Sequence, residues 1–265
     1  RVMDRIEKIS VIIPTYNSAN FIEKTLESLV RQTVLPEEII IVDDGSKDNT
    51  VEIINKWTQH KKSLNKKLKQ NQHKGPGEAR NIGIQLSTGD WISFLDSDDT
   101  WEPKKIYEVK KIIRNNININ FITHYEYFIN NNKKKSVISK KLKLFKNSKF
   151  DIKSYCYISN IFSTSAVTCK KDLLIKFGKF DKKLPNAQDY DLWLKLLPYI
   201  NLFIIEKNLG TYFQRKLNIT SRPYYKRILS ELKICFRYKK YVSLRLFTFK
   251  FIKILFSKRW FELWV

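Results

Sequence analysis

Three carboxylates crowd into four consecutive positions of this chain, although its 50 Lys and Arg far outnumber its 26 Asp and Glu. Asp96, Asp98 and Asp99 directly follow the apolar run at 91–95. Like charges at this spacing repel, so water, basic neighbours or a bound cation must offset them. Mg²⁺ and Mn²⁺ prefer oxygen ligands and often use one or two carboxylates plus substrate phosphates. We therefore expect Asp96 and Asp98 to bind a divalent metal and Asp99 to cap a helix beginning near Pro103; capping without a metal is the alternative.

The acidic stretch follows one of three predicted strands that end in polar residues. Continuous apolar runs rich in β-branched residues are typical of strands buried on both faces, and they occur at 9–14, 39–42 and 91–95. Helical periodicity predicts helices within 17–32, 49–57 and 75–87. This alternation predicts an α/β fold with a largely parallel sheet flanked by helices. Ligands of such sheets gather at the carboxyl ends of strands, which here carry the polar clusters 15–17, 43–46 and 96–99.

The second half of the chain is less regular. Its middle, 115–155, predicts a loop or an edge hairpin with a basic face. His124 lies on a predicted strand and is expected to be a packed or a surface histidine rather than a ligand. Apolar runs then predict further strands and helices, with strands at 163–169, 201–206 and 210–215 and helices at 170–177 and 187–197.

Five motifs, in this order, resemble the family 2 glycosyltransferases, inverting enzymes with the GT-A fold. They are VIIPTYN (11–17), IIIVDDGSKDNT (39–50), ARNIGI (79–84), GDWISFLDSDD (89–99) and QDYDLWLKL (188–196). The resemblance implies a GT-A catalytic domain over 1–215, followed by a basic helical tail over 216–265. It also implies transfer of a hexosyl or N-acetylhexosaminyl group from a nucleotide diphosphate, for which we expect UDP. The expected acceptor is a saccharide or lipid-linked saccharide in bacterial polysaccharide assembly.

The resemblance further implies roles for the residues that match the motifs on the donor side. Arg80 matches an arginine beside the uridine and diphosphate, although a surface ion pair with Glu78 or another carboxylate is the alternative. Ser97 accompanies the two metal-binding aspartates. Pro14, Thr15 and Tyr16 would line the nucleoside pocket, with core packing as the alternative for Tyr16. Asp43 or Asp44 would bind the edge of the base. Asp44 is preferred, because side chains alternate along a strand and only one of the two can point inward.

On the acceptor side, Asp189 matches the catalytic base of the family's second acidic motif, in which Gln188 replaces the usual Glu. Inversion needs such a base to take the proton of the attacking hydroxyl. The alternative is a helix N-terminal carboxylate stabilised by the helix dipole, and Asp191 is expected to be structural. Many relatives carry a histidine near 210–221, where this chain has none; Arg215 or Lys216 would then contact phosphate.

The net charge of +24 is concentrated at one end, because residues 215–265 hold 14 basic and two acidic residues, a net +12. Amphipathic basic helices with many aromatic residues favour anionic membranes, and Lys250, Lys253 and Ser257 form their predicted polar stripe. Packing on the catalytic domain or formation of a homo-oligomer is the alternative. No apolar stretch reaches the length of a spanning helix, so we expect a cytoplasmic protein at the inner face of the membrane.

Two other functions remain open at the level of sequence. A nucleotidyltransferase would also use paired aspartates and a divalent cation but needs no acceptor-side base. A basic nucleic-acid-binding module would explain the charge, yet it would leave the aspartate clusters unexplained and the chain has no recognisable nucleic-acid motif, so we expect no specific nucleic acid.

Overall fold

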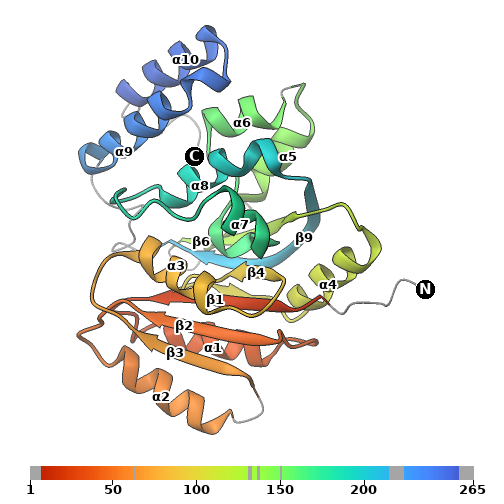
Figure 1. The fold of residues 1–265 in the computed structure, drawn as a ribbon, viewed down its shortest axis with the longest axis vertical. Helices are drawn as coiled ribbons and strands as arrows, with labels where there is room; N and C mark the ends of the chain where they lie inside the picture. Colours follow the sequence, from red (N-terminus) through yellow and green to blue (C-terminus); the bar gives the residue numbers. More distant parts are fainter. Residues whose placement is uncertain are drawn as a thin grey trace.

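The computed structural model describes residues 7–61, 64–130, 133–135, 138–149, 151–214 and 224–256. Within them, helices flank a single mixed sheet (Figure 1). The strands are β1 (Ile9–Thr15), β2 (Glu38–Asp43), β3 (Lys66–Gln70), β4 (Trp91–Phe94), β5 (Thr100–Trp101), β6 (Phe121–Asn130), β7 (Lys133–Lys135), β8 (Thr168–Lys170) and β9 (Leu202–Phe213). The α-helices are α1 (Ile22–Val30), α2 (Thr50–His60), α3 (Pro76–Leu86), α4 (Lys105–Asn115), α5 (Ile138–Lys146), α6 (Ile152–Ile158), α7 (Lys171–Phe177), α8 (Gln188–Leu196), α9 (Tyr224–Arg237) and α10 (Leu244–Leu255). Short 3-10 turns are η1 (Thr164–Ala166), η2 (Leu197–Tyr199) and η4 (Lys239–Tyr241).

The first half of the sheet is parallel, as the sequence predicts. Strand β1 pairs with β2 on one side and β4 on the other, and β2 pairs with β3. Every residue of β1 and β2 is buried, which explains their continuous apolar runs. Strand β3 was predicted as part of a polar connection, because KKLKQ shows neither alternation nor an apolar run. It forms at the edge of the sheet, where its backbone pairs with β2 alone and its side chains are largely exposed.

The second half of the sheet contains antiparallel pairs that the sequence did not predict. The strand order is β3-β2-β1-β4-β8-β6-β9-β5, with β7 added to β6 as the predicted edge hairpin. Strand β8 is antiparallel to both β4 and β6. The two predicted strands after 200 are one long strand, β9, which runs parallel to β6 with a bulge between His124 and Glu126. The predicted strand at 163–169 is mostly the turn η1, with only its end in β8.

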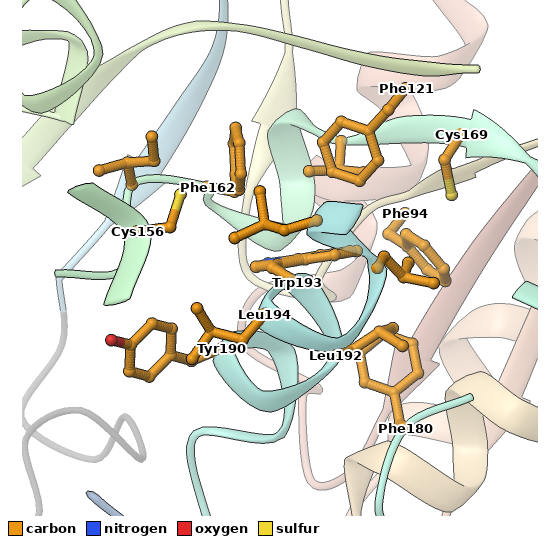
Figure 2. Packing of buried hydrophobic residues seen from close by; sticks show 14 of the residues in the cluster. Phe94, Phe121, Cys156, Phe162, Cys169, Phe180, Tyr190, Leu192, Trp193 and Leu194 are labelled. Carbon is orange, nitrogen blue, oxygen red and sulfur yellow. The ribbon is translucent and has the colours of Figure 1, made fainter. Parts of the chain in front are cut away.

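Apolar side chains fill both faces of the sheet. One cluster joins α1, α2 and α4 to the sheet, and the other joins its opposite face to α6, α8 and the last two helices. Trp193 of α8 lies at the centre of the second cluster, with its ring centroid 5.5 Å from that of Phe121 and 6.3 Å from that of Phe94 (Figure 2). Helix α3 packs so closely on β1 that a Cβ at Gly83 would collide with Ile12. This close approach places α3 beside the carboxyl ends of the strands.

The last two helices pack on the body that the sheet and α8 form. Ile234 and Cys235 of α9 are fully buried, and Ile254 of α10 is 5% exposed within the same cluster as Trp193. Figure 1 shows α9 and α10 beside α8 and α6, at the end of the molecule remote from α2. The prediction that Lys250 belongs to an exposed polar stripe was wrong: it is 2% exposed, and its ammonium donates to the Tyr157 carbonyl oxygen at 2.6 Å. Ser257 lies outside the described residues.

None of the described helices combines the length and the apolar character needed to cross a bilayer. The three cysteines, Cys156, Cys169 and Cys235, are buried and unpaired. The α/β fold with a helical C-terminal extension agrees with the sequence-based expectation.

Replacing Ile234 by Ala tests whether α9 shares the core that contains Trp193. We expect a loss of about 2–5 kcal/mol in the free energy of unfolding, because a fully buried side chain leaves a cavity. Leu229→Ala in the same helix is the control: that side chain is 65% exposed, so the change should stay within about 0.5 kcal/mol. Urea unfolding measures both. Equal, small effects would mean that α9 does not contribute to this core.

Candidate active site

The predicted site residues converge at the carboxyl edge of β1, β2 and β4. Thr15 and Asp43 are register partners, and the Asp44 N–H donates to the Thr15 carbonyl oxygen at 2.8 Å. The loop after β4 joins this edge through a 2.8 Å hydrogen bond between the hydroxyls of Ser97 and Ser18. Three clusters that are far apart in the sequence thus lie side by side, as the predicted topology requires.

At the β2 end, both aspartates accept hydrogen bonds from the surrounding loops. Asp44 accepts the main-chain N–H groups of Lys74 and Gly75 at 2.9 and 2.8 Å, which fixes the entry to α3. Asp43 accepts the N–H groups of the turn at 45–46. Both carboxylates are 2% exposed. They therefore hold the shape of this end of the site, and either could take a further hydrogen bond on a remaining lone pair.

Tyr16 is 39% exposed and is not a core residue. Its ring stacks on the imidazole of His73, with ring centroids 4.1 Å apart and an interplanar angle of 26°. The Nδ1 atom of His73 lies 2.9 Å from Asp44 Oδ2. The tyrosine ring thus offers a flat surface beside Asp44, a suitable wall for a planar base.

The loop at 96–99, called the acidic loop below, is held by hydrogen bonds to hydroxyl groups of α1 and η1. Thr25 of α1 donates to the carbonyl oxygens of Ser97 at 2.9 Å and Asp99 at 2.8 Å. Ser165 of η1 accepts the Asp96 N–H at 3.1 Å and donates to Asp99 Oδ2 at 2.6 Å. Asp99 also accepts the Phe213 N–H at 3.2 Å. The predicted helix cap at Asp99 was wrong, because α4 has no side-chain cap and Asp99 instead ties the loop to η1 and β9.

Charge is unevenly compensated around this loop. Arg80 of α3 is 8% exposed and its Nη2 lies 2.5 Å from Asp96 Oδ1, so its ion partner is Asp96 and not Glu78. Burial, with the charges of Asp98, Asp96 and Glu126, raises the pKa of Asp99 well above its ordinary value. Burial also raises the pKa of Glu126 to about 7. The charges of Asp96 and Asp98 thus act on Asp99, and a cation bound near them would offset that repulsion.

The acidic loop offers a divalent cation two carboxylate ligands, from Asp96 and Asp98. Asp96 and Asp98 are partly exposed carboxylates two residues apart in the loop after β4, and carboxylates are the donor type that Mg²⁺ and Mn²⁺ prefer. No group of three or more His, Cys, Asp or Glu side chains in the described ranges could hold a metal by itself. The protein part of such a site would therefore be a carboxylate pair, with the remaining ligands supplied by water or phosphate. Arg215 and Lys216, the expected phosphate contacts, lie outside the described residues.

Asp189 lies in the first turn of α8, close enough to Arg80 and Asp96 for both charges to act on it. Burial raises its pKa above the ordinary value; the charge of Arg80, the Tyr190 N–H and the Asn160 amide oppose that rise, and the charge of Asp96 adds to it. Helix α8 is brought against α3 at Gly77, where a Cβ would lie 2.7 Å from Gln188 Oε1. A carboxylate that is more basic than usual thus lies within the electrostatic range of the Arg80–Asp96 pair.

The expected structural role of Asp191 is confirmed. It is fully buried, its Oδ1 lies 2.6 Å from Nη1 of Arg237, and its carbonyl oxygen accepts from the Tyr238 hydroxyl at 2.9 Å. His124, expected to be either packed or at the surface, is fully buried, and burial, with the charge of Lys105, lowers its pKa to about 3. The contacts of Asp191 with Arg237 and Tyr238 therefore anchor the first turn of α8, which carries Asp189, to the C-terminal extension.

Several buried polar atoms at this edge find no hydrogen-bond partner among the described residues. They are Thr15 Oγ1, Asn71 Nδ2 and Arg80 Nε. Buried polar groups are rarely left unsatisfied unless water or a ligand serves them. Their position along the strand ends therefore supports a polar ligand lying there.

One cavity lies between α3 and the loop at 179–183. Its volume is about 380 Å³. It is lined by Glu78, Asn81, Ile82, Gln85, Lys179, Phe180, Asp181, Lys182 and Lys183. No residue assigned to the site from sequence lines it, so this cavity is separate from the candidate site.

Three residues near the site were not assigned from sequence: His73, Asn160 and Ser165. Each reaches it from a loop or a short turn, without the strand and helix periodicity that guided the other assignments. Only His73 had an available signal, because it precedes the Gly75–Gly77 turn into α3.

A family model described as "Glycosyl transferase family 2" matches residues 10–176. The chain is 32% identical over 190 residues to an uncharacterized glycosyltransferase of Haemophilus influenzae, covering 71% of this chain and 62% of that protein. It is 31% identical over 209 residues to one of Methanocaldococcus jannaschii, covering 77% and 70%. The chain spans about three fifths of the length of several curated relatives.

Two solved structures show the same fold. S. aureus TarS 1–349 in complex with UDP-GlcNAc has a TM-score of 0.66 and 24% identity, covering 85% of this chain and 66% of that one. The mannosyltransferase PcManGT from Pyrobaculum calidifontis, in complex with GDP-Man and Mn²⁺, has a TM-score of 0.71 and 17% identity, covering 96% and 71%. At these identities the likeness supports the fold alone.

Proposed function

Because this chain belongs to glycosyltransferase family 2 and has the GT-A fold, we propose that it transfers a sugar from a UDP-sugar with inversion at the anomeric carbon. The acceptor is a saccharide or lipid-linked saccharide in bacterial polysaccharide assembly. The observation that carries the proposal is the gathering of Arg80, the Asp96–Asp98 pair and Asp189 at one strand edge.

The donor would lie along the ends of β1, β2 and β4. Thr15 and the Tyr16 ring would line the nucleoside site together with Pro14, and Asp44 or Asp43 would accept the imide N–H of uracil. Arg80, with an unused Nε donor, would contact the diphosphate. TarS is solved with UDP-GlcNAc, which supports a UDP-sugar, whereas the GDP-Man of PcManGT shows that the fold also serves another base.

Asp98 and Asp96 would hold Mn²⁺ or Mg²⁺, and the ion would neutralise charge on the departing diphosphate. Ser97 is 9% exposed and orients the loop through Ser18. The Mn²⁺ in the PcManGT complex supports a divalent ion for this fold.

Asp189 would act as the general base. As the acceptor oxygen bonds to the anomeric carbon, the carboxylate takes its proton and the bond between that carbon and the diphosphate oxygen breaks. The raised pKa of Asp189 suits this role, because a more basic carboxylate binds the proton of the acceptor hydroxyl more readily.

The outer face of α10 would contact an anionic membrane from the cytoplasmic side. Phe249, Ile252 and Phe256 recur at helical spacing and are 55%, 48% and 60% exposed, while Lys250 and Ile254 face the protein. Exposed basic residues surround this face, namely Lys239, Lys240 and Arg245. Such a surface suits peripheral binding to anionic lipid, and a homo-oligomer through the same face is the competing arrangement.

Replacing Asp98 by Ala tests the metal assignment. We expect the Mn²⁺-dependent part of UDP binding to disappear, because the ion would lose one of its two protein ligands. A thermal-shift titration of UDP with and without Mn²⁺ measures it, since ligand at a hundred times its dissociation constant adds about 2.7 kcal/mol to stability. Asp172→Ala, at an exposed position on α7, is the control. An unchanged Mn²⁺ effect in Asp98→Ala would refute the assignment.

Asp189→Asn should lower transfer about 10²–10⁴-fold while UDP affinity remains unchanged, because only the proton acceptor is lost. In the wild type, kcat/KM should fall as pH drops through a limb above the ordinary Asp pKa, since the raised pKa leaves Asp189 protonated there. Transfer from UDP-glucose, UDP-galactose and UDP-N-acetylglucosamine serves as the assay. Full activity of the variant would exclude this base, and a nucleotidyl transfer product would favour the other enzyme class.

Phe249→Ser combined with Ile252→Ser should reduce co-sedimentation with phosphatidylglycerol vesicles, because the variant removes apolar area from the outer face of α10. Ile117→Ser combined with Ile175→Ser is the matched control, since these side chains are 89% and 52% exposed elsewhere. If both variants sediment alike, α10 does not bind the membrane. A dimer in solution that only the first variant dissociates would instead show self-association.

A further inference from the structure

Asn160 contacts the carboxylate of Asp189 from the loop that follows α6. Its Nδ2 donates to Asp189 Oδ2 at 2.9 Å, and its Oδ1 accepts the main-chain N–H of Phe162 at 3.2 Å. The side chain is therefore held at both ends of its amide group. No sequence motif singled it out.

The orientation of this amide is determined by its two partners. A main-chain N–H can only donate, and an ionised carboxylate can only accept. The oxygen of Asn160 must therefore face Phe162 and the nitrogen must face Asp189; the flipped amide would set donor against donor and acceptor against acceptor. Phe162 is 2% exposed, with its ring centroid 5.1 Å from that of Phe121, so the core fixes the main chain that holds the amide.

The groups that act on Asp189 come from several elements. Arg80 of α3 contributes a positive charge, Asp96 after β4 a negative one, and the Tyr190 N–H of α8 a hydrogen bond. Asn160 differs from Arg80 because it donates a hydrogen bond without adding charge. It can hold the carboxylate without neutralising it, which preserves more of its basicity than a second cation would.

We propose that Asn160 is a positioning residue for Asp189, which holds Oδ2 so that Oδ1 takes the proton of the acceptor hydroxyl. This inference rests on the proposed role of Asp189 as the base. It also assigns the loop 159–163 to the acceptor side of the site. The same loop lies between α6, which contacts α10, and η1, which holds the acidic loop.

Asn160→Asp is the sharpest test, because it is nearly isosteric. Its carboxylate can still accept the Phe162 N–H, and only the bond donated to Asp189 is replaced by a facing negative charge. Asn160→Ala is the second variant, which removes both contacts. Asn120→Ala is the matched control: the Asn120 amide donates to the Tyr199 carbonyl oxygen at 2.9 Å and accepts the Asn201 N–H at 2.6 Å, just before β6, at the opposite end of the sheet.

Two readouts separate positioning from a merely structural role. The first is the pKa of Asp189 itself, followed through its ¹³C carboxyl NMR signal, which is identified by its absence in Asp189→Asn and needs no substrate. The second is the acidic limb of the pH profile of kcat/KM, measured with UDP-glucose, UDP-galactose and UDP-N-acetylglucosamine as probes.

We expect the pKa and the limb to rise by about one pH unit in Asn160→Ala and by more in Asn160→Asp, because a donated bond is lost and a like charge is added. One unit lowers kcat/KM about tenfold below the limb. The KM for the donor should stay within about twofold, and Asn120→Ala should leave both readouts unchanged.

Outcomes that contradict the inference are distinct from those that contradict the proposed function. If either Asn160 variant folds and keeps the wild-type pKa of Asp189 and the wild-type limb, Asn160 does not position the base. If Asp189→Asn itself keeps full transfer activity, the proposed base is wrong and the inference fails with it.

Discussion

Repulsion among carboxylates at the end of β4 is the constraint around which this site is built. Asp96, Asp98 and Asp99 stand within four residues, and the charge of Glu126 acts on Asp99 from β6, which β8 separates from β4. Arg80 offsets part of this charge through Asp96, and the buried Lys105 lies among the polar groups behind the loop, where its ammonium donates to the Thr168 hydroxyl at 2.7 Å. Burial lowers the pKa of Lys105 to about 7, because the buried position disfavours the charged form of its ammonium group. A bound cation would complete the compensation that the described side chains provide only in part.

The need to hold that loop explains contacts from otherwise separate parts of the chain. Hydroxyl groups of α1 and η1 fix the main chain of the loop. The close approach of α3 to β1 at Gly83 places Arg80 of the same helix where it contacts Asp96. The C-terminal extension serves the acceptor side in the same way, since Lys250 and Arg237 contact Tyr190 and Asp191, the two residues that follow the proposed base. The extension is therefore both a structural support for α8 and, through its outer face, the proposed membrane contact.

Local periodicity predicted the elements that place the donor side, because β1, β2 and β4 are buried on both faces and α3 carries an apolar stripe. The convergence of Thr15, Asp43 and Asp96 followed from parallel topology. Local periodicity could not predict β3, because its lysine-rich sequence forms a strand only through pairing with β2. It could not predict the burial of Lys250 either, because that depends on contacts with Tyr157 and Tyr190, which are far away in the chain. Asp99 was assigned to the nearest helix, whereas its partners Ser165 and Phe213 come from distant elements.

Paramagnetic broadening by Mn²⁺ in the presence of UDP tests the account of this acidic edge, since the ion broadens amide NMR signals according to their distance from it. The account predicts that broadening is strongest at residues 96–98 and extends to Arg80 and Asp189, both of which lie beside Asp96. Strong broadening confined to other carboxylates, with the amides of residues 96–98 and 189 unaffected, would contradict it.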